Sequence, residues 1–67
     1  TSYYVNQNAQ SNGDHEVHTE GCSFMPAVRN RFYLGQFSGC AGAVQAARQH
    51  YPQSNGCFYC SRMCHTS

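Results

Sequence analysis

Two cysteines separated by two residues, Cys57 and Cys60, directly follow an Asn-Gly dipeptide near the end of the 67-residue chain. This spacing lets both sulfur atoms face one metal ion, and the preceding turn frees backbone N–H groups to donate hydrogen bonds to the thiolates. Structural zinc sites commonly combine such a pair with two ligands from elsewhere in the chain. His18 and Cys22 are the predicted second pair, since Gly21 lets the chain bend just before Cys22. The sequence therefore predicts a Zn²⁺ ion in a closed tetrahedral shell of one imidazole and three thiolates, with no position for water or substrate.

The remaining cysteines, Cys40 and Cys64, leave several arrangements open. The chain has five cysteines, so they cannot all be paired within one molecule. In one arrangement Cys40 is a free thiol that is buried on a helix as a small apolar residue. In another, Cys64 replaces His18 as a ligand in an all-thiolate site. A Cys40–Cys64 disulfide beside the zinc is a further alternative, which would suit an oxidising compartment. A redox role for Cys57 and Cys60 is less favoured, because a thioredoxin-like pair should begin a long helix and few residues follow it here.

The length of the chain limits how stable an apolar core can make it. A domain of this size rarely gains more than about 3–5 kcal/mol of net stability from its core, so it usually needs a disulfide, a metal or a partner. A zinc-finger-sized site binds its metal with about 10–16 kcal/mol of apparent free energy. We therefore expect residues 1–67 to form a single domain that is largely unfolded without its metal.

Three segments have the pattern of β-strands. Residues 3–9 and 15–18 are predicted to pair as a hairpin, because the Asn-Gly dipeptide at residues 12–13 lies between them. Residues 31–37 are rich in aromatic side chains, which suit a half-buried pleated surface. Gly35 within this segment indicates a bulge or a close approach of backbone.

One helix is predicted over residues 39–50, with Ser38 as its N-cap and Pro52 just beyond its end. Its apolar stripe follows the 3.6-residue period and comprises Cys40, Ala43, Val44, Ala47 and Tyr51. A second turn is expected at residues 54–56, opening onto the Cys-x-x-Cys pair. The predicted fold is a small α+β domain with a short antiparallel sheet of about three strands, one main helix and a C-terminal Cys-x-x-Cys turn.

The charged residues exclude some classes of function. The formal net charge is +1, and the three acidic residues all lie within residues 14–20, so neither a catalytic pair of carboxylates nor a Ser/His/Asp set can be assembled convincingly. The N-terminus has no pattern of a secretory signal peptide, and no apolar run approaches the roughly 20 residues of a membrane span. We expect a cytoplasmic protein without a membrane partner, or a secreted one if its cysteines form disulfides.

Candidate contacts to a partner come from three residues between the predicted ligand pairs. Arg29 and Arg31 could contact phosphate groups, and Phe24 could stack on a base. Phe32 and Tyr33 could stack together with Phe24, although Phe32 is better explained as part of the core. These residues suggest a nucleic acid or a protein as partner.

The order of these motifs resembles the Ada-type zinc-binding domain. In that family a ligand-x3-Cys pair precedes an Asn-Arg-aromatic strand, a short helix and a Cys-x-x-Cys pair. The matching segments here are His18-Thr-Glu-Gly-Cys22, Asn30-Arg-Phe-Tyr-Leu, Ser38 to Ala43 and Gly56-Cys57-Phe-Tyr-Cys60. The chain is also similar to a group of small bacterial cysteine-rich proteins with the pattern Tyr-Leu-Gly-x-Phe, Asn-Gly-Cys-x-Tyr-Cys and Cys-His-Thr.

The resemblance implies the fold and the ligands but not the reaction. Ada domains that repair DNA accept a methyl group on a zinc-bound cysteine, the first residue of the first ligand pair. The matching residue is His18, whose imidazole offers no thiolate to alkylate. We therefore expect a non-enzymatic structural zinc module that contacts a nucleic acid or protein partner. The alternatives are a secreted, disulfide-stabilised protein and a thiol-based redox or alkyl-acceptor protein.

Overall fold

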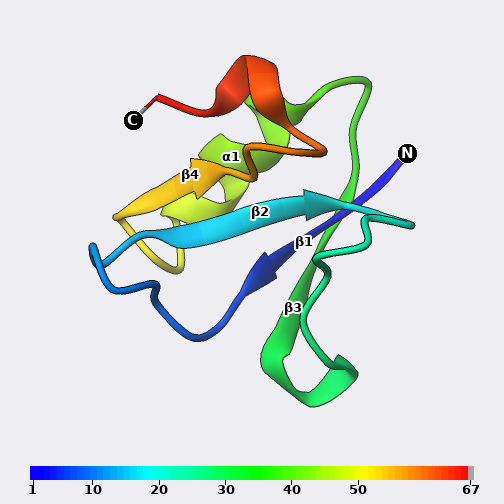
Figure 1. Ribbon diagram of the computed structural model, residues 1–67. Coiled ribbons are helices and arrows are strands. Elements are labelled where there is room, and N and C mark those ends of the chain that lie inside the picture. Colours follow the sequence, from blue (N-terminus) through cyan, green and yellow to red (C-terminus); the bar gives the residue numbers. More distant parts are fainter. Residues whose placement is uncertain (67) are drawn as a thin grey trace.

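A four-stranded sheet with one helix on its face forms the framework of the protein (Figure 1). The computed structural model describes residues 1–66. Its elements are β1 (Ser2–Asn6), β2 (His15–Thr19), the 3-10 turn η1 (Val28–Asn30), β3 (Arg31–Gln36), α1 (Cys40–Arg48), β4 (Ser54–Gly56) and the 3-10 turn η2 (Arg62–Cys64). The strand order in the sheet is β3-β1-β2-β4. The predicted α+β class with one main helix is confirmed.

The predicted hairpin is present as the antiparallel pair β1–β2. Tyr4 lies opposite His18, and Val5 lies opposite Val17. The two strands are joined by residues 7–14, a longer connection than the two-residue turn that the Asn-Gly dipeptide suggested. Gly13 has a positive φ of 92° but the residue before it does not, so the conformation needed for the two-residue hairpin turn is absent from residues 7–14.

The predicted third strand is β3, which pairs antiparallel with β1 on the outer side of the hairpin. The bulge predicted at Gly35 is confirmed. Tyr3 lies opposite Gly35 but Tyr4 lies opposite Tyr33, so Leu34 is an extra residue without an opposite partner. Gly35 has a φ of +120°, a backbone conformation that glycine adopts at low cost.

The predicted apolar stripe places α1 on the core. Ala43, Val44 and Ala47 are buried, and Cys40 and Tyr51 pack partly buried beside them, as predicted. The helix begins one residue later than expected. Its N-cap is Gly39, which makes no side-chain cap, so the prediction of Ser38 as the cap was wrong.

Strand β4 occupies the segment for which a turn was predicted. Ser54, Asn55 and Gly56 are all buried and pair in parallel with β2. Parallel neighbours need a long crossover connection, which residues 20–53 supply with η1, β3 and α1. The sheet is therefore mixed, and it has one strand more than the antiparallel sheet of about three strands that we expected.

The core between sheet and helix is small and made mainly of short side chains: Tyr3, Val5, Val17, Ala43, Val44 and Ala47. Phe32 was expected to belong to it, but 39% of this residue is exposed and its ring lies against that of His50. Phe32 lies opposite the buried Val5 and so shares the core face of the sheet, but β3 is an edge strand, which leaves this ring at the border of the core. In the described part of the chain, no helix has the length and apolar character needed to cross a membrane.

Candidate metal centre

The four predicted ligands lie together at one end of the sheet. One ligand atom from each of His18, Cys22, Cys57 and Cys60 lies within 4.8 Å of the other three. Tetrahedral zinc–sulfur bonds of about 2.3 Å place neighbouring sulfurs about 3.8 Å apart, so a modest contraction would give a metal-bound geometry. His18 and Cys57 are buried and the other two are partly buried. The group could therefore hold a metal ion.

Parallel pairing of β2 and β4 explains why residues so distant in the sequence meet. Val17 lies opposite Gly56, so the two strands end at the same edge of the sheet. A predicted ligand follows each of these two residues: His18 follows Val17 within β2, and Cys57 follows Gly56 just beyond β4. The Cys57 N–H donates to the Val17 carbonyl at 2.9 Å and continues the ladder up to the site. The register of this strand pair therefore brings one ligand pair to the other.

Backbone N–H groups surround the sulfur atoms, but they come from Thr19, Phe24, Tyr59 and Cys60 and not from residues 54–56, the turn that was predicted to supply them. The Thr19 N–H donates to Cys60 Sγ at 3.2 Å, and the Phe24 N–H donates to Cys22 Sγ at 3.4 Å. The Cys57 sulfur accepts from the N–H groups of Tyr59 and Cys60. Such bonds stabilise thiolates, and each of the three sulfurs has at least one.

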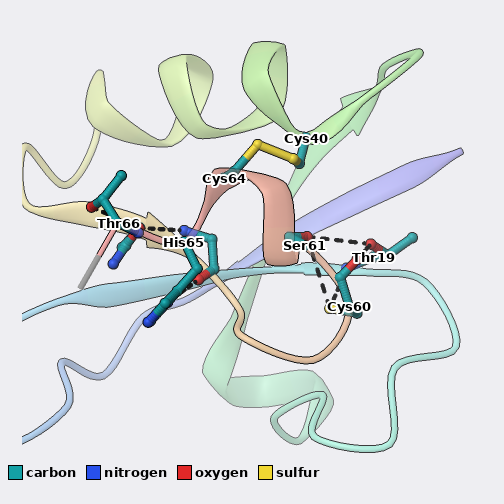
Figure 2. Close-up of a disulfide and its surroundings, with 9 residues drawn as sticks. Thr19, Cys40, Cys60, Ser61, Cys64, His65 and Thr66 are labelled. Carbon is teal, nitrogen blue, oxygen red and sulfur yellow. Dashed lines mark hydrogen bonds between the residues drawn. A yellow bond between two sulfur atoms is a disulfide. The ribbon is translucent and has the colours of Figure 1, made fainter.

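Side chains also fix the turn that carries Cys60. The Thr19 hydroxyl donates to the Cys60 carbonyl at 3.1 Å and lies 3.4 Å from the Ser61 hydroxyl (Figure 2). This contact joins the end of β2 to the second cysteine of the Cys-x-x-Cys pair. The turn is therefore anchored by polar contacts that involve neither the metal nor a disulfide.

Burial and hydrogen bonding shift the pKa values of the three thiols in different directions. The pKa of Cys22 is raised to about 12, chiefly by burial, and the neighbouring Cys57 and Cys60 act in the same direction, whereas the Phe24 N–H opposes them. Burial also raises the pKa of Cys57. At Cys60 burial acts in the same direction, but hydrogen bonds from Thr19 and the other two thiols outweigh it and lower the pKa. Three thiolates can be accommodated together only if a positive charge offsets their repulsion.

His18 presents a neutral imidazole to the sulfurs. Its Nδ1 lies 3.9 Å from Cys60 Sγ. Burial lowers its pKa, and the nearby Glu16 carboxylate only partly opposes this effect. A neutral ring keeps a lone pair for a metal, which is the form in which histidine acts as a ligand. His18 therefore has the position and the protonation state of a ligand.

Cys40 and Cys64 form a disulfide that joins the first turn of α1 to η2 (Figure 2). Their Cα atoms lie 6.2 Å apart, within the usual range for a disulfide. The alternative in which Cys64 replaces His18 as a ligand is therefore wrong, and so is the prediction of Cys40 as a free buried thiol. The disulfide alternative is the one that the structure shows.

The candidate partner contacts have different neighbours in the structure. Phe24 is 55% exposed, and its ring stacks on Tyr59 with centroids 4.3 Å apart. Arg31 instead lies over the ring of Tyr4, 5.1 Å from its centroid, and the exposed Arg29 belongs to η1. Sequence reasoning missed the exposed aromatic residues inside the Cys-x-x-Cys pair. Side chains between two ligands of one metal point outward, and that spacing could have identified them.

The histidines outside the site make local contacts. His15 Nδ1 donates to the Asn6 carbonyl at 2.9 Å, and His65 Nδ1 donates to the Gly56 carbonyl at 3.0 Å. His50 is exposed. None of the three belongs to the ligand group found among residues 1–66.

No family model, curated protein or solved structure matches this chain. The similarity to the Ada-type domain stays a prediction from the residues that carry it.

Proposed function

We propose that this protein is a structural zinc-binding module in which one Zn²⁺ ion is held by His18, Cys22, Cys57 and Cys60. The observation that carries the proposal is the convergence of these four groups within 4.8 Å from two distant segments. Thiolate and imidazole ligands in a tetrahedral arrangement are typical of zinc, whereas harder cations prefer oxygen ligands. The ion would join the end of β2 to the turn that follows β4.

Two features favour a structural role over a catalytic one. Four protein ligands complete the tetrahedral shell, whereas catalytic zinc sites keep a position for water or substrate. In addition, the described residues enclose no pocket that could hold a substrate. We therefore propose that the protein is not an enzyme and that its metal stabilises the fold.

The disulfide adds a second cross-link and favours an oxidising compartment. Disulfides persist in secreted and periplasmic proteins and are rare in the reducing cytosol. The secreted, disulfide-stabilised alternative is thus compatible with the metal site, because the disulfide uses only the two cysteines that the metal does not need. We propose a protein with both cross-links, which functions outside the reducing cytosol.

Native mass spectrometry with a count of free thiols tests the proposal. We expect one zinc ion per chain, one disulfide, and three free thiols once the metal is removed under denaturing conditions. Removing zinc with a chelator should abolish most of the folded circular dichroism signal. A chain that binds no metal after expression with zinc, and that melts identically with and without chelator, would overturn the zinc proposal.

A pair of variants compares the loss of the proposed ligand histidine with the loss of a histidine outside the site. His18→Gln removes a proposed ligand, whereas His50→Gln changes an exposed histidine outside the site. We expect zinc affinity to fall at least tenfold in the first variant and to change less than twofold in the second. Equal affinities in the two variants would remove His18 from the ligand set.

A second candidate function is contact with single-stranded nucleic acid through an aromatic surface beside the metal. This surface is made of Phe24, Phe58, Tyr59 and Arg62. Phe24 stacks on Tyr59, which is 68% exposed, and Arg62 lies 4.9 Å from the centroid of Phe58. Residues 21–67 contain all four arginines and no acidic residue. Exposed aromatic rings and arginine together favour stacking on bases and contact with phosphate.

Fluorescence anisotropy with a labelled single-stranded oligonucleotide tests this second function. We expect binding at low salt that weakens as salt increases. Tyr59→Ala should weaken it, whereas Tyr33→Ala, which removes an exposed ring from β3, should not. No binding at low salt, or binding that does not respond to salt, would overturn the nucleic-acid proposal and leave a protein as the candidate partner.

A further inference from the structure

The two nitrogens of the His18 ring face different groups. Nδ1 faces the thiols, 3.9 Å from Cys60 Sγ. Nε2 lies on the far side of the ring, 3.7 Å from Glu16 Oε1. Nε2 is buried, and it has no hydrogen-bond partner among residues 1–66. It is the single buried side-chain nitrogen or oxygen left without a partner in the described part of the chain.

Metal binding at Nδ1 determines where the ring proton must be. A neutral imidazole carries one N–H, and the nitrogen that binds the metal cannot keep it. The proton of a zinc-bound His18 is therefore on Nε2, which becomes a buried donor. A buried donor without an acceptor destabilises the folded state, so this N–H needs a partner.

The Glu16 carboxylate is the acceptor within reach. Glu16 and His18 are alternate residues of β2, so their side chains leave the strand on the same face. The present distance of 3.7 Å is longer than a hydrogen bond, which needs an N···O distance of about 2.7–3.2 Å. The Glu16 side chain is 18% exposed, and within residues 1–66 its carboxylate accepts no hydrogen bond that would have to break, so a small rotation can close the gap.

We propose that Glu16 is a positioning residue for the metal centre, and that its carboxylate accepts the Nε2–H of His18 when the metal is bound at Nδ1. This inference rests on the proposed zinc site. The contact holds the ring in the orientation that the metal requires and raises the basicity of the ligating nitrogen. Partners of this kind in other metal sites typically contribute 10–100-fold to metal affinity.

Competition with a chromophoric chelator measures the effect on zinc affinity. We expect Glu16→Ala to bind zinc at least tenfold more weakly than the unmodified chain. Glu16→Gln keeps an acceptor oxygen but no charge, and should bind with intermediate affinity. Glu20→Gln is the matched control, because it removes one negative charge from an exposed residue just after β2. It should change the affinity less than twofold.

The imidazole N–H signals of His18 in ¹⁵N NMR of the zinc-loaded chain provide a second readout. We expect a proton on Nε2 that exchanges slowly with water in the unmodified chain and faster in Glu16→Gln. A purely structural role of Glu16 would change the melting temperature without changing this exchange.

The outcomes separate the two proposals. If the unmodified chain binds no zinc, the metal site itself is wrong and this role falls with it. If that chain binds zinc but both Glu16 variants match Glu20→Gln in affinity and in exchange, only the role of Glu16 is overturned. Zinc bound at Nε2 with the proton on Nδ1 would also overturn it. If Glu16→Ala fails to fold, Glu16→Gln decides the question.

Discussion

Gly56 joins the fold to the metal centre. It pairs with Val17 at the end of β4 and directly precedes Cys57. A Cβ atom built at this position would lie 2.7 Å from the carbonyl oxygen of Ser61 and 2.8 Å from the Cβ of Cys64. The first of these is backbone and the second is held by a disulfide, so neither can easily move. The φ of Gly56 is not positive, so its backbone conformation does not require glycine. The close packing of the neighbouring atoms does.

Gly56→Ala should therefore lower the free energy of unfolding by about 1–3 kcal/mol, the usual cost of overpacking a tight site. Urea unfolding of the zinc-loaded chain measures this change. Gly39→Ser is a suitable comparison, because nothing lies within 4 Å of a Cβ added at Gly39. Equal stability of Gly56→Ala and the unmodified chain would show that the C-terminal turn can move away from β4.

The buried ring of His18 predicts that stability is lost on acidification. Burial lowers its pKa below the ordinary value of 6.5, and the opposing effect of Glu16 is smaller. As the pH falls below 6.5, the unfolded chain binds a proton at His18 that the folded chain does not, so the free energy of unfolding decreases. Metal binding to the ring acts in the same direction, because it also excludes the proton.

Thermal unfolding of the zinc-loaded chain at about pH 7.5 and about pH 5.5 tests the direction in which stability changes with pH. We expect a lower melting temperature at the lower pH. His50→Gln should keep the same dependence, because His50 is exposed. A melting temperature that is equal or higher at the lower pH would contradict the prediction.

Among the elements, α1 has a well-packed apolar face but an N-terminus without a side-chain cap. Its apolar stripe packs on the sheet, but its N-cap residue has no side chain to accept a backbone N–H. Gly39 has an extended backbone, with φ −161° and ψ 173°, which is compatible with a capping serine. The helix is therefore held by tertiary packing and by the disulfide at Cys40 more than by its own end.

Gly39→Ser should raise the free energy of unfolding by a few tenths of a kcal/mol, because serine caps a helix slightly better than glycine. Ser38→Ala should leave stability nearly unchanged, since Ser38 lies outside the cap position. Urea unfolding of both variants gives the comparison. A loss of more than about 0.5 kcal/mol in Ser38→Ala, the least that removing a real cap costs, would mean that Ser38 does cap the helix in solution.

For the molecule as a whole, two cross-links act on the same C-terminal segment. The proposed zinc site holds Cys57 and Cys60 against the end of β2, and the disulfide holds Cys64 against α1. The core beneath them is small. The disulfide stabilises the fold mainly by reducing the freedom of the unfolded chain, and the metal would stabilise it by binding the folded chain, whose apolar burial alone stabilises it weakly.

Replacing the disulfide should weaken the fold without removing the metal site. The two cysteines are 24 residues apart, and closing a loop of this length is worth about 3.5 kcal/mol in the chain-entropy model. We expect Cys40→Ala/Cys64→Ala to lose about 2–4 kcal/mol of stability while still binding one zinc per chain. Urea unfolding and native mass spectrometry measure the two effects. Loss of zinc from a chain that is still folded would show that the disulfide positions the ligands.

Local patterns in the sequence predicted the hairpin, the bulge at Gly35, the stripe of α1 and the four grouped side chains. Each depends on residues close together in the chain or on ligand types with a known spacing. Strand β4 was not predictable in this way. Its three residues, Ser54, Asn55 and Gly56, have the composition of a turn. They form a strand because β2 offers an unpaired edge, to which a distant crossover returns them.

The sequence by itself therefore determined which side chains are able to bind a metal, since the residue types and the spacing within each pair suffice for that. Only the tertiary structure decided how the two pairs meet and how the other two cysteines are used. Cys64 is close enough in sequence to Cys60 to serve as a ligand, yet η2 turns it toward Cys40 on α1. The physical reason is that ligand chemistry is local, whereas the parallel register of β2 and β4 and the packing of η2 on α1 depend on contacts between segments far apart in the chain.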